Sequence, residues 1–127
     1  MGQRRFLVTA GLPYSNGRLH VGHIAGAYLP ADIYVRYLRA TGADVRFICG
    51  SDDNGVAALK TAREQKCSVE ELTARFNESQ RRDFQGLGID FDIFGGTHQP
   101  DFVENHNQFS QDFFSKIHAK GMFTKRS

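Results

Sequence analysis

Cysteine is scarce in this sequence of 127 residues: only Cys49 and Cys67 occur, and they do not form a Cys-x-x-Cys pair. This scarcity argues against a disulfide framework and against a zinc knuckle, and it is typical of a reducing compartment. Long apolar runs are also missing. No stretch approaches the ~20 apolar residues that span a membrane, and the basic start at Met1–Arg5 precedes an apolar run too short for a signal peptide. We therefore expect a cytoplasmic chain with no membrane partner and no zinc site.

An excess of charge of one sign is lacking as well. The net charge is +2, which is too small to indicate a nucleic-acid partner by itself, because a dedicated binder usually carries a basic cluster. No glycine–lysine phosphate loop occurs, so the sequence gives no support for ATP binding of the Walker type. The remaining composition, 40% hydrophobic and 24% charged, is that of an ordinary globular domain. The length allows one domain at most.

Three apolar runs predict β-strands, at residues 6–10, 45–49 and 89–94. The first is apolar almost throughout, which is typical of a strand buried on both faces of a parallel sheet.

Helical periodicity fills most of the intervals between these runs. We expect a helix from about Leu19 to Ala40 that is interrupted at Pro30, because proline lacks an N–H and clashes with the preceding turn. Ser68 and Glu71 have the spacing of a capping box, which predicts a helix start there. Further helices are expected at 56–66, 68–84 and 101–120. The last carries a helical stripe of apolar residues at Phe102, Phe109, Phe113 and Ile117.

The alternation of strands and helices predicts an α/β fold with a doubly wound parallel sheet. Ligands of such sheets bind beyond the carboxyl ends of the strands. Two unusual segments, 11–23 and 50–55, each follow a predicted strand, so we expect them to meet at one edge of the sheet. Only three strands are present, which amounts to the first half of such a domain.

The segment that follows the first strand has the features of a phosphate site. It is a strand, then a turn containing Pro13 and Asn16, then a helix that opens with His20 and His23. Unpaired N–H groups and the helix dipole attract anions to such a helix start. The spacing of three residues places both imidazoles on one helix face. Gly22 between them leaves the backbone bare, so that a flat ring such as adenine can lie against it.

The tetrad His20-Val21-Gly22-His23 resembles the HIGH signature of class I aminoacyl-tRNA synthetases. Its prefix Leu12-Pro13-Tyr14-x-Asn16-Gly17 has the form found in methionyl-tRNA synthetases, and Phe47–Gly55 resembles the acidic loop of the same family. The likeness extends more loosely through Ala31-Asp32-x-x-x-Arg36-Tyr37 and Phe91–Phe94. The chain is thus identified as a member of this family. The resemblance implies that residues 1–127 are the N-terminal half of the catalytic domain and end near a connective insertion.

The resemblance also implies a reaction and its residues. The parent enzyme would activate methionine with ATP, with Mg²⁺ at the phosphates, and then transfer it to tRNA. His20 and His23 would be catalytic and would bind ATP, together with Gly22 and Asn16.

On the amino-acid side, the carboxylate of Asp52 and the backbone carbonyl of Leu12 would hold the methionine ammonium group. Tyr14 would line the methionine pocket. Asp53 would cap the next helix or support the site, although the roles of these two neighbouring aspartates remain open at this point. Because the rest of the synthetase polypeptide would complete the site, we expect the isolated chain to be inactive.

Two alternatives compete with this interpretation. A short paralogue could keep the nucleotide-facing loop as a binding module without catalysis; the intact set of His20, His23 and Asp52 argues against it. A different HxGH nucleotidyltransferase is opposed by the Asp52 loop and by the prefix that begins at Leu12.

Overall fold

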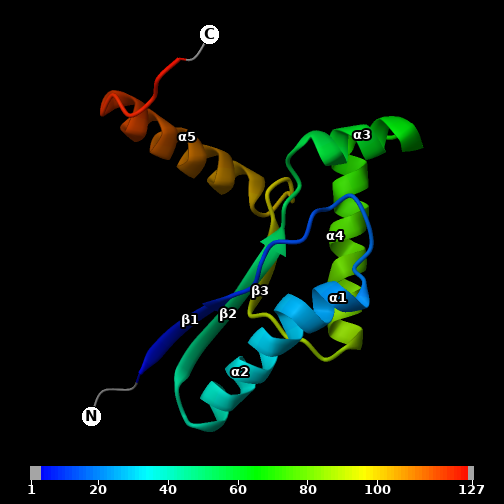
Figure 1. Cartoon of the computed structure of the whole chain (residues 1–127), viewed down its shortest axis with the longest axis vertical. Helices are drawn as coiled ribbons and strands as arrows, with labels where there is room; N and C mark the ends of the chain where they lie inside the picture. The colour runs from blue at the N-terminus through cyan, green and yellow to red at the C-terminus, as the bar shows by residue number, and fades with distance from the viewer. Residues whose placement is uncertain (1–3, 126–127) are drawn as a thin grey trace.

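A computed structural model describes residues 4–125, so Met1–Gln3 of the basic start lie outside the described residues (Figure 1). Three strands form one sheet in the order β1-β2-β3, and both pairings are parallel. The strands are β1 (Arg5–Thr9), β2 (Asp44–Ser51) and β3 (Ile93–Gly96). The predicted α/β fold with a parallel sheet is therefore confirmed.

Helices connect the strands, as parallel pairing requires. Between β1 and β2 lie α1 (Val21–His23), the π-helix η1 (Ile24–Tyr28) and α2 (Leu29–Ala40). Between β2 and β3 lie α3 (Val56–Gln65) and α4 (Val69–Gly86), and α5 (Val103–Ala119) follows β3. The predicted capping box opens α4: the Ser68 hydroxyl accepts from the Glu71 N–H, and the Glu71 carboxylate accepts from the Ser68 N–H.

The core lies between one face of the sheet and the helices α2 and α4. It joins Val35 and Leu38 of α2, Phe47 of β2 and Phe84 of α4, all of them buried. The ring of Phe84 meets Tyr28 edge-on at a centroid distance of 4.7 Å. This layer fixes the helix that carries the two histidines against the sheet.

The predicted interruption at Pro30 takes a different form. The helical backbone runs on from α1 through α2, and Pro30 occupies the first turn of α2. The adjustment comes earlier, where the Leu29 N–H bonds the Ile24 carbonyl and the turn widens to a π-helix. A π-turn changes the hydrogen-bond register of a helix without ending it, so the proline is accommodated at the start of a new α-segment.

The third strand begins later in the chain than the start of the predicted range of 89–94. β3 begins at Ile93, because Ile89 and Phe91 instead pack into the core from the connection that follows α4. The carboxylate of Asp92 accepts from the Phe47 N–H at 2.6 Å and from Arg39 at 2.9 Å, so it faces the neighbouring strand and helix.

The prediction that the first strand is buried on both faces is wrong for the described residues. Leu7 of β1 is 66% exposed, since the helices of residues 4–125 that pack on the sheet cover its other face. The stripe on the last helix is likewise unburied: α5 projects from the end of the sheet (Figure 1) and has no buried residue. Phe109 is 74% exposed there. Within residues 4–125, no helix is long and apolar enough to cross a membrane.

Candidate functional site

The two unusual loops meet, as their positions after β1 and β2 predict. Tyr14 and Asp52 form a parallel backbone bridge beyond the ends of the two strands. The Asp52 N–H donates to the Pro13 carbonyl at 2.8 Å, and the Ser15 N–H donates to the Asp52 carbonyl at 3.1 Å. The backbone therefore brings Leu12, Tyr14 and Asp52 to one edge of the sheet.

The histidine pair forms the start of the helix that follows. His20 is the N-cap, and its Nδ1 accepts from the Gly22 N–H at 3.1 Å. The Nδ1 of His23 accepts from the His20 N–H at 3.2 Å, which completes a reciprocal capping box made of two imidazoles. Because an accepting Nδ1 carries no hydrogen, each neutral ring holds its proton on Nε2. The pair thus has two Nε2–H groups that are available as donors to an anion.

A cavity of about 340 Å³ lies between the first loop and the helix. Leu12, Tyr14, Asn16 and His23 line it, so four of the predicted site residues share one hollow. The backbone at Gly22 is also accessible: a Cβ built there would meet only the His20 ring, at 3.0 Å. His20, Gly22 and Asp52 are not among the residues that line this cavity.

Tyr28 also lines this cavity, and sequence reasoning did not single it out. Its side chain is 3% exposed, and burial raises the pKa of Tyr28 to about 12. The phenol is therefore neutral at physiological pH and can donate a hydrogen bond. Its place at the end of the π-helix, which the sequence pattern did not predict, explains why it was missed.

Asp52 and Asp53 have different surroundings. The Asp52 side chain is partly exposed, and its Oδ1 accepts from the Asn54 N–H at 3.2 Å. Asp53 is completely buried and accepts from the Ser15 hydroxyl in one neighbouring loop and from the His98 N–H in the other. The capping role considered for Asp53 is wrong, because the N-cap of α3 is Gly55 and no side chain caps this helix.

Two side-chain amides of α4 donate hydrogen bonds to the segments around the site, and sequence reasoning missed both. Gln80 donates from Nε2 to the Tyr14 carbonyl at 2.9 Å. Asn77 donates from Nδ2 to the Ser51 hydroxyl and to the Gly95 carbonyl, each at 2.8 Å. Both side chains are buried, and their spacing of three residues on an amphipathic helix is the signal that was available.

A second hollow lies on the open face of the sheet, against the start of α5. Its volume is about 570 Å³, and Leu12, Cys49 and Phe109 are among its lining residues. Burial raises the pKa of Cys49 to about 11, against a smaller lowering by a backbone hydrogen bond at Gly50. Cys49 is thus a neutral thiol and not a nucleophile at neutral pH.

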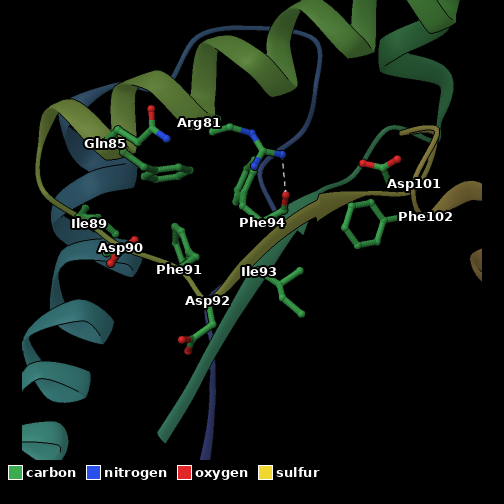
Figure 2. A pocket seen from close by; sticks show the side chains of 11 residues that line it. Arg81, Gln85, Ile89, Asp90, Phe91, Asp92, Ile93, Phe94, Asp101 and Phe102 are labelled. Atoms are coloured by element: carbon green, nitrogen blue, oxygen red, sulfur yellow. Dashed lines mark hydrogen bonds between the residues drawn. The ribbon is translucent and has the colours of Figure 1, made fainter.

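A third hollow, of about 320 Å³, lies between α4 and the approach to β3 (Figure 2). Arg81 reaches into it and donates to the Phe94 carbonyl at 2.7 Å, and its guanidinium carbon lies 5.5 Å from the centroid of the Phe94 ring. None of the predicted site residues lines this hollow. It is separate from the edge where the two loops meet.

Comparison with known proteins places this geometry in context. Residues 6–127 match the family model described as tRNA synthetases class I (M). The methionine–tRNA ligase of Pyrococcus furiosus is 48% identical over 96% of this chain and 16% of its own length. That of Porphyromonas gingivalis is 42% identical over 98% of this chain and 18% of its own length. The chain therefore spans less than a fifth of these curated relatives.

Solved structures show the same likeness. The Mycobacterium tuberculosis methionyl-tRNA synthetase in complex with methionyl-adenylate gives a TM-score of 0.75 at 30% identity, over 80% of this chain and 20% of that chain. The LeuRS of Agrobacterium radiobacter K84, in a ternary complex with tRNA and LeuAMS, gives a TM-score of 0.84 at 26% identity. That match covers 95% of this chain and 15% of the other.

Proposed function

This chain belongs to the class I tRNA synthetases of the methionine type, and we propose that it supplies part of the catalytic site of a methionine–tRNA ligase. The reaction joins methionine to AMP with release of pyrophosphate and then transfers methionine to tRNA. The observation that carries the proposal is the Tyr14–Asp52 bridge, which sets the two family-like loops side by side next to the histidine-capped helix start.

The histidine pair acts on the ATP side. In the first step the methionine carboxylate attacks the α-phosphorus, and the bond to pyrophosphate breaks as negative charge gathers on the leaving oxygens. The Nε2–H groups of His20 and His23 donate to phosphate oxygens and stabilise that charge. In this role the two imidazoles act as neutral hydrogen-bond donors and transfer no proton. The methionine carboxylate is the nucleophile. Gly22 leaves room for the adenine, and Asn16 lies in the adjoining turn.

The paired loops act on the methionine side. The Asp52 carboxylate forms a charge-assisted hydrogen bond with the substrate ammonium group, and the backbone carbonyl of Leu12 accepts a second one. Tyr14, which is 62% exposed, presents its ring to the thioether, because sulfur makes favourable contacts with aromatic rings.

Further partners belong to the same proposal. We assign Mg²⁺ to the ATP phosphates, as the family resemblance implies. Residues 4–125 hold no group of three His, Cys, Asp or Glu side chains arranged to bind a metal. The segment 1–127 is proposed as the N-terminal half of the catalytic domain, completed by the rest of the synthetase polypeptide, which also binds tRNA. A cytoplasmic location is consistent with two free cysteines.

Amino-acid-dependent ATP–pyrophosphate exchange tests the proposal. We expect the complete protein that carries this segment to exchange with methionine and not with leucine, and the 127-residue chain alone to be inactive. Exchange by the 127-residue chain alone would show that these residues hold a sufficient site. If neither protein exchanges but the complete protein binds ATP, the binding module without catalysis is the correct alternative.

A further inference from the structure

Asp53 is a buried carboxylate that forms no ion pair with the cations of residues 4–125. Its side chain is 0% exposed, and none of the ion pairs among residues 4–125 involves it. A buried carboxylate is costly unless hydrogen bonds satisfy it, so its donors show which parts of the chain it holds together.

The donors to Asp53 come from all three strand ends. On Oδ1 it accepts from the hydroxyls of Ser15 and Ser51, each at 2.6 Å. On Oδ2 it accepts from the His98 N–H at 2.9 Å and from Gln99 Nε2 at 3.3 Å. One carboxylate therefore joins the loop after β1, the end of β2 and the turn after β3.

The surroundings leave this carboxylate little freedom. A Cβ at Gly96 would lie 2.6 Å from Asp53 Oδ2 and 2.7 Å from the Ser51 hydroxyl. The Ser51 hydroxyl also accepts from Asn77 of α4 at 2.8 Å, so the network is anchored to a helix of the core.

The network lies directly beneath the proposed methionine site. At the Tyr14–Asp52 bridge these two side chains are exposed or partly exposed, while the next residues, Ser15 and Asp53, are fully buried. Successive side chains of extended backbone point to opposite faces. Tyr14 and Asp52 therefore face the proposed site, while Ser15 and Asp53 face the network. The hydrogen bond between Ser15 and Asp53 ties the two loops at the point where they present Tyr14 and Asp52.

We propose that Asp53 and Ser15 are positioning residues, which hold the Tyr14 and Asp52 loops in register for methionine binding. The inference rests on the proposed function and adds to it two residues that do not touch the substrate. A site held by a fixed supporting layer loses little freedom on binding, whereas a loosened loop must be ordered by the substrate. Loss of the link should therefore weaken methionine binding selectively.

The test is Ser15→Ala in the complete protein that carries this segment. This change removes one donor and leaves Asp53 with three, so the carboxylate stays satisfied. We expect the KM for methionine in pyrophosphate exchange to rise about tenfold, the loss of roughly one hydrogen bond to a charged group. We expect kcat and the KM for ATP to change less than about threefold, because the histidine pair is held by its own capping bonds.

The matched control is Ser68→Ala, which removes the cap of α4 and lies outside the network. It lowers the melting temperature while the KM for methionine stays unchanged. Ser15→Cys, a weaker donor of similar size, should give an intermediate KM and serves if Ser15→Ala does not fold. An unchanged KM in both Ser15 variants, or an equal rise in Ser68→Ala, would overturn the positioning role while leaving the proposed function intact. Absence of exchange in the unaltered protein would overturn both.

Discussion

The imidazole of His20 stacks on that of His23, with ring centroids 3.6 Å apart and planes inclined by 22°. Each ring is held at Nδ1 by a backbone N–H, so the capping box fixes both the tautomer and the orientation. A single local motif therefore builds the start of the helix and holds two Nε2–H donors next to each other. Structure and proposed catalysis are joined in the same two side chains.

His20→Asn separates these two roles. Asparagine is a good N-cap, so the helix start is kept, while the outward Nε2–H is lost. We expect kcat for methionine-dependent pyrophosphate exchange to fall by the equivalent of about 2.7–4 kcal/mol of barrier, and the KM for methionine to stay the same. His118→Asn, an exposed histidine of α5, is the control for the substitution itself. Normal turnover of the His20 variant would contradict the role of the pair in stabilising the leaving group.

Asp52→Asn tests the methionine side. The amide keeps the shape of the side chain and loses the charge, so the bond to the substrate ammonium loses its ionic part. We expect the KM for methionine to rise about tenfold to a hundredfold, since hydrogen bonds to charged groups contribute about 1.5–3 kcal/mol. Asp112→Asn on exposed α5 should leave it unchanged. Comparison with Asp53→Ala is uninformative for the direct contact, because that change leaves four donors, two of them on the buried residues Ser15 and Ser51, without this acceptor.

Much of the fold could be predicted because its signals are local. The capping box at Ser68 and Glu71 needs only the spacing of two residues, and the meeting of the two loops follows from parallel strands. The histidine tetrad and the Asp52 loop were found for the same reason: each is a short continuous motif.

The rest depends on distant contacts. The spacing of Asn77 and Gln80 indicates that they share one helix face. Their hydrogen bonds to Ser51, Gly95 and Tyr14 could not be predicted, because those partners are distant in the sequence and meet α4 only in the folded chain. The stripe on α5 correctly indicated an amphipathic helix. Periodicity identifies the apolar face of a helix but not whether another element buries it, and within residues 4–125 no residue of α5 is buried.

The difference between the buried core and the exposed face of α5 can be measured with one phenylalanine from each. Phe84 is 1% exposed and contacts Tyr28, Phe91 and Phe94, so Phe84→Ala should lower the free energy of unfolding by about 3–5 kcal/mol. Phe109 is 74% exposed, and Phe109→Ser should change it by less than about 0.5 kcal/mol. Denaturant titration of the chain gives both values. A large loss for Phe109→Ser would mean that α5 packs against something in solution.

Gly96→Ala should destabilise the chain, because the added methyl group would clash with the side chains around Asp53. The new methyl would lie 2.6 Å from Asp53 Oδ2 and from Gln99 Cγ, so the buried network must shift. Overpacking of this kind costs about 1–3 kcal/mol. Gly86→Ala at the end of α4 is the control, because nothing lies within 4 Å of the added atom. There, the higher helix propensity of alanine should stabilise the chain by up to about 1 kcal/mol. Equal effects at both glycines, in thermal or denaturant unfolding, would contradict the tight packing around Asp53.

The Cys49 thiol should be unreactive at neutral pH and become reactive only in strong base. Burial raises the pKa of Cys49 to about 11, so the folded protein keeps a proton that the unfolded chain, with a thiol pKa near 8.5, has already lost at lower pH. The stability is therefore fully present below the unfolded value and falls as pH rises toward about 11. In Cys67→Ser, which leaves a single thiol, we expect the alkylation rate with iodoacetamide to rise about tenfold per pH unit between pH 8 and pH 10. A rate at pH 8 that equals that of the denatured chain would show that Cys49 is open to solvent, and the hollow against α5 would then be wider than the structure has it.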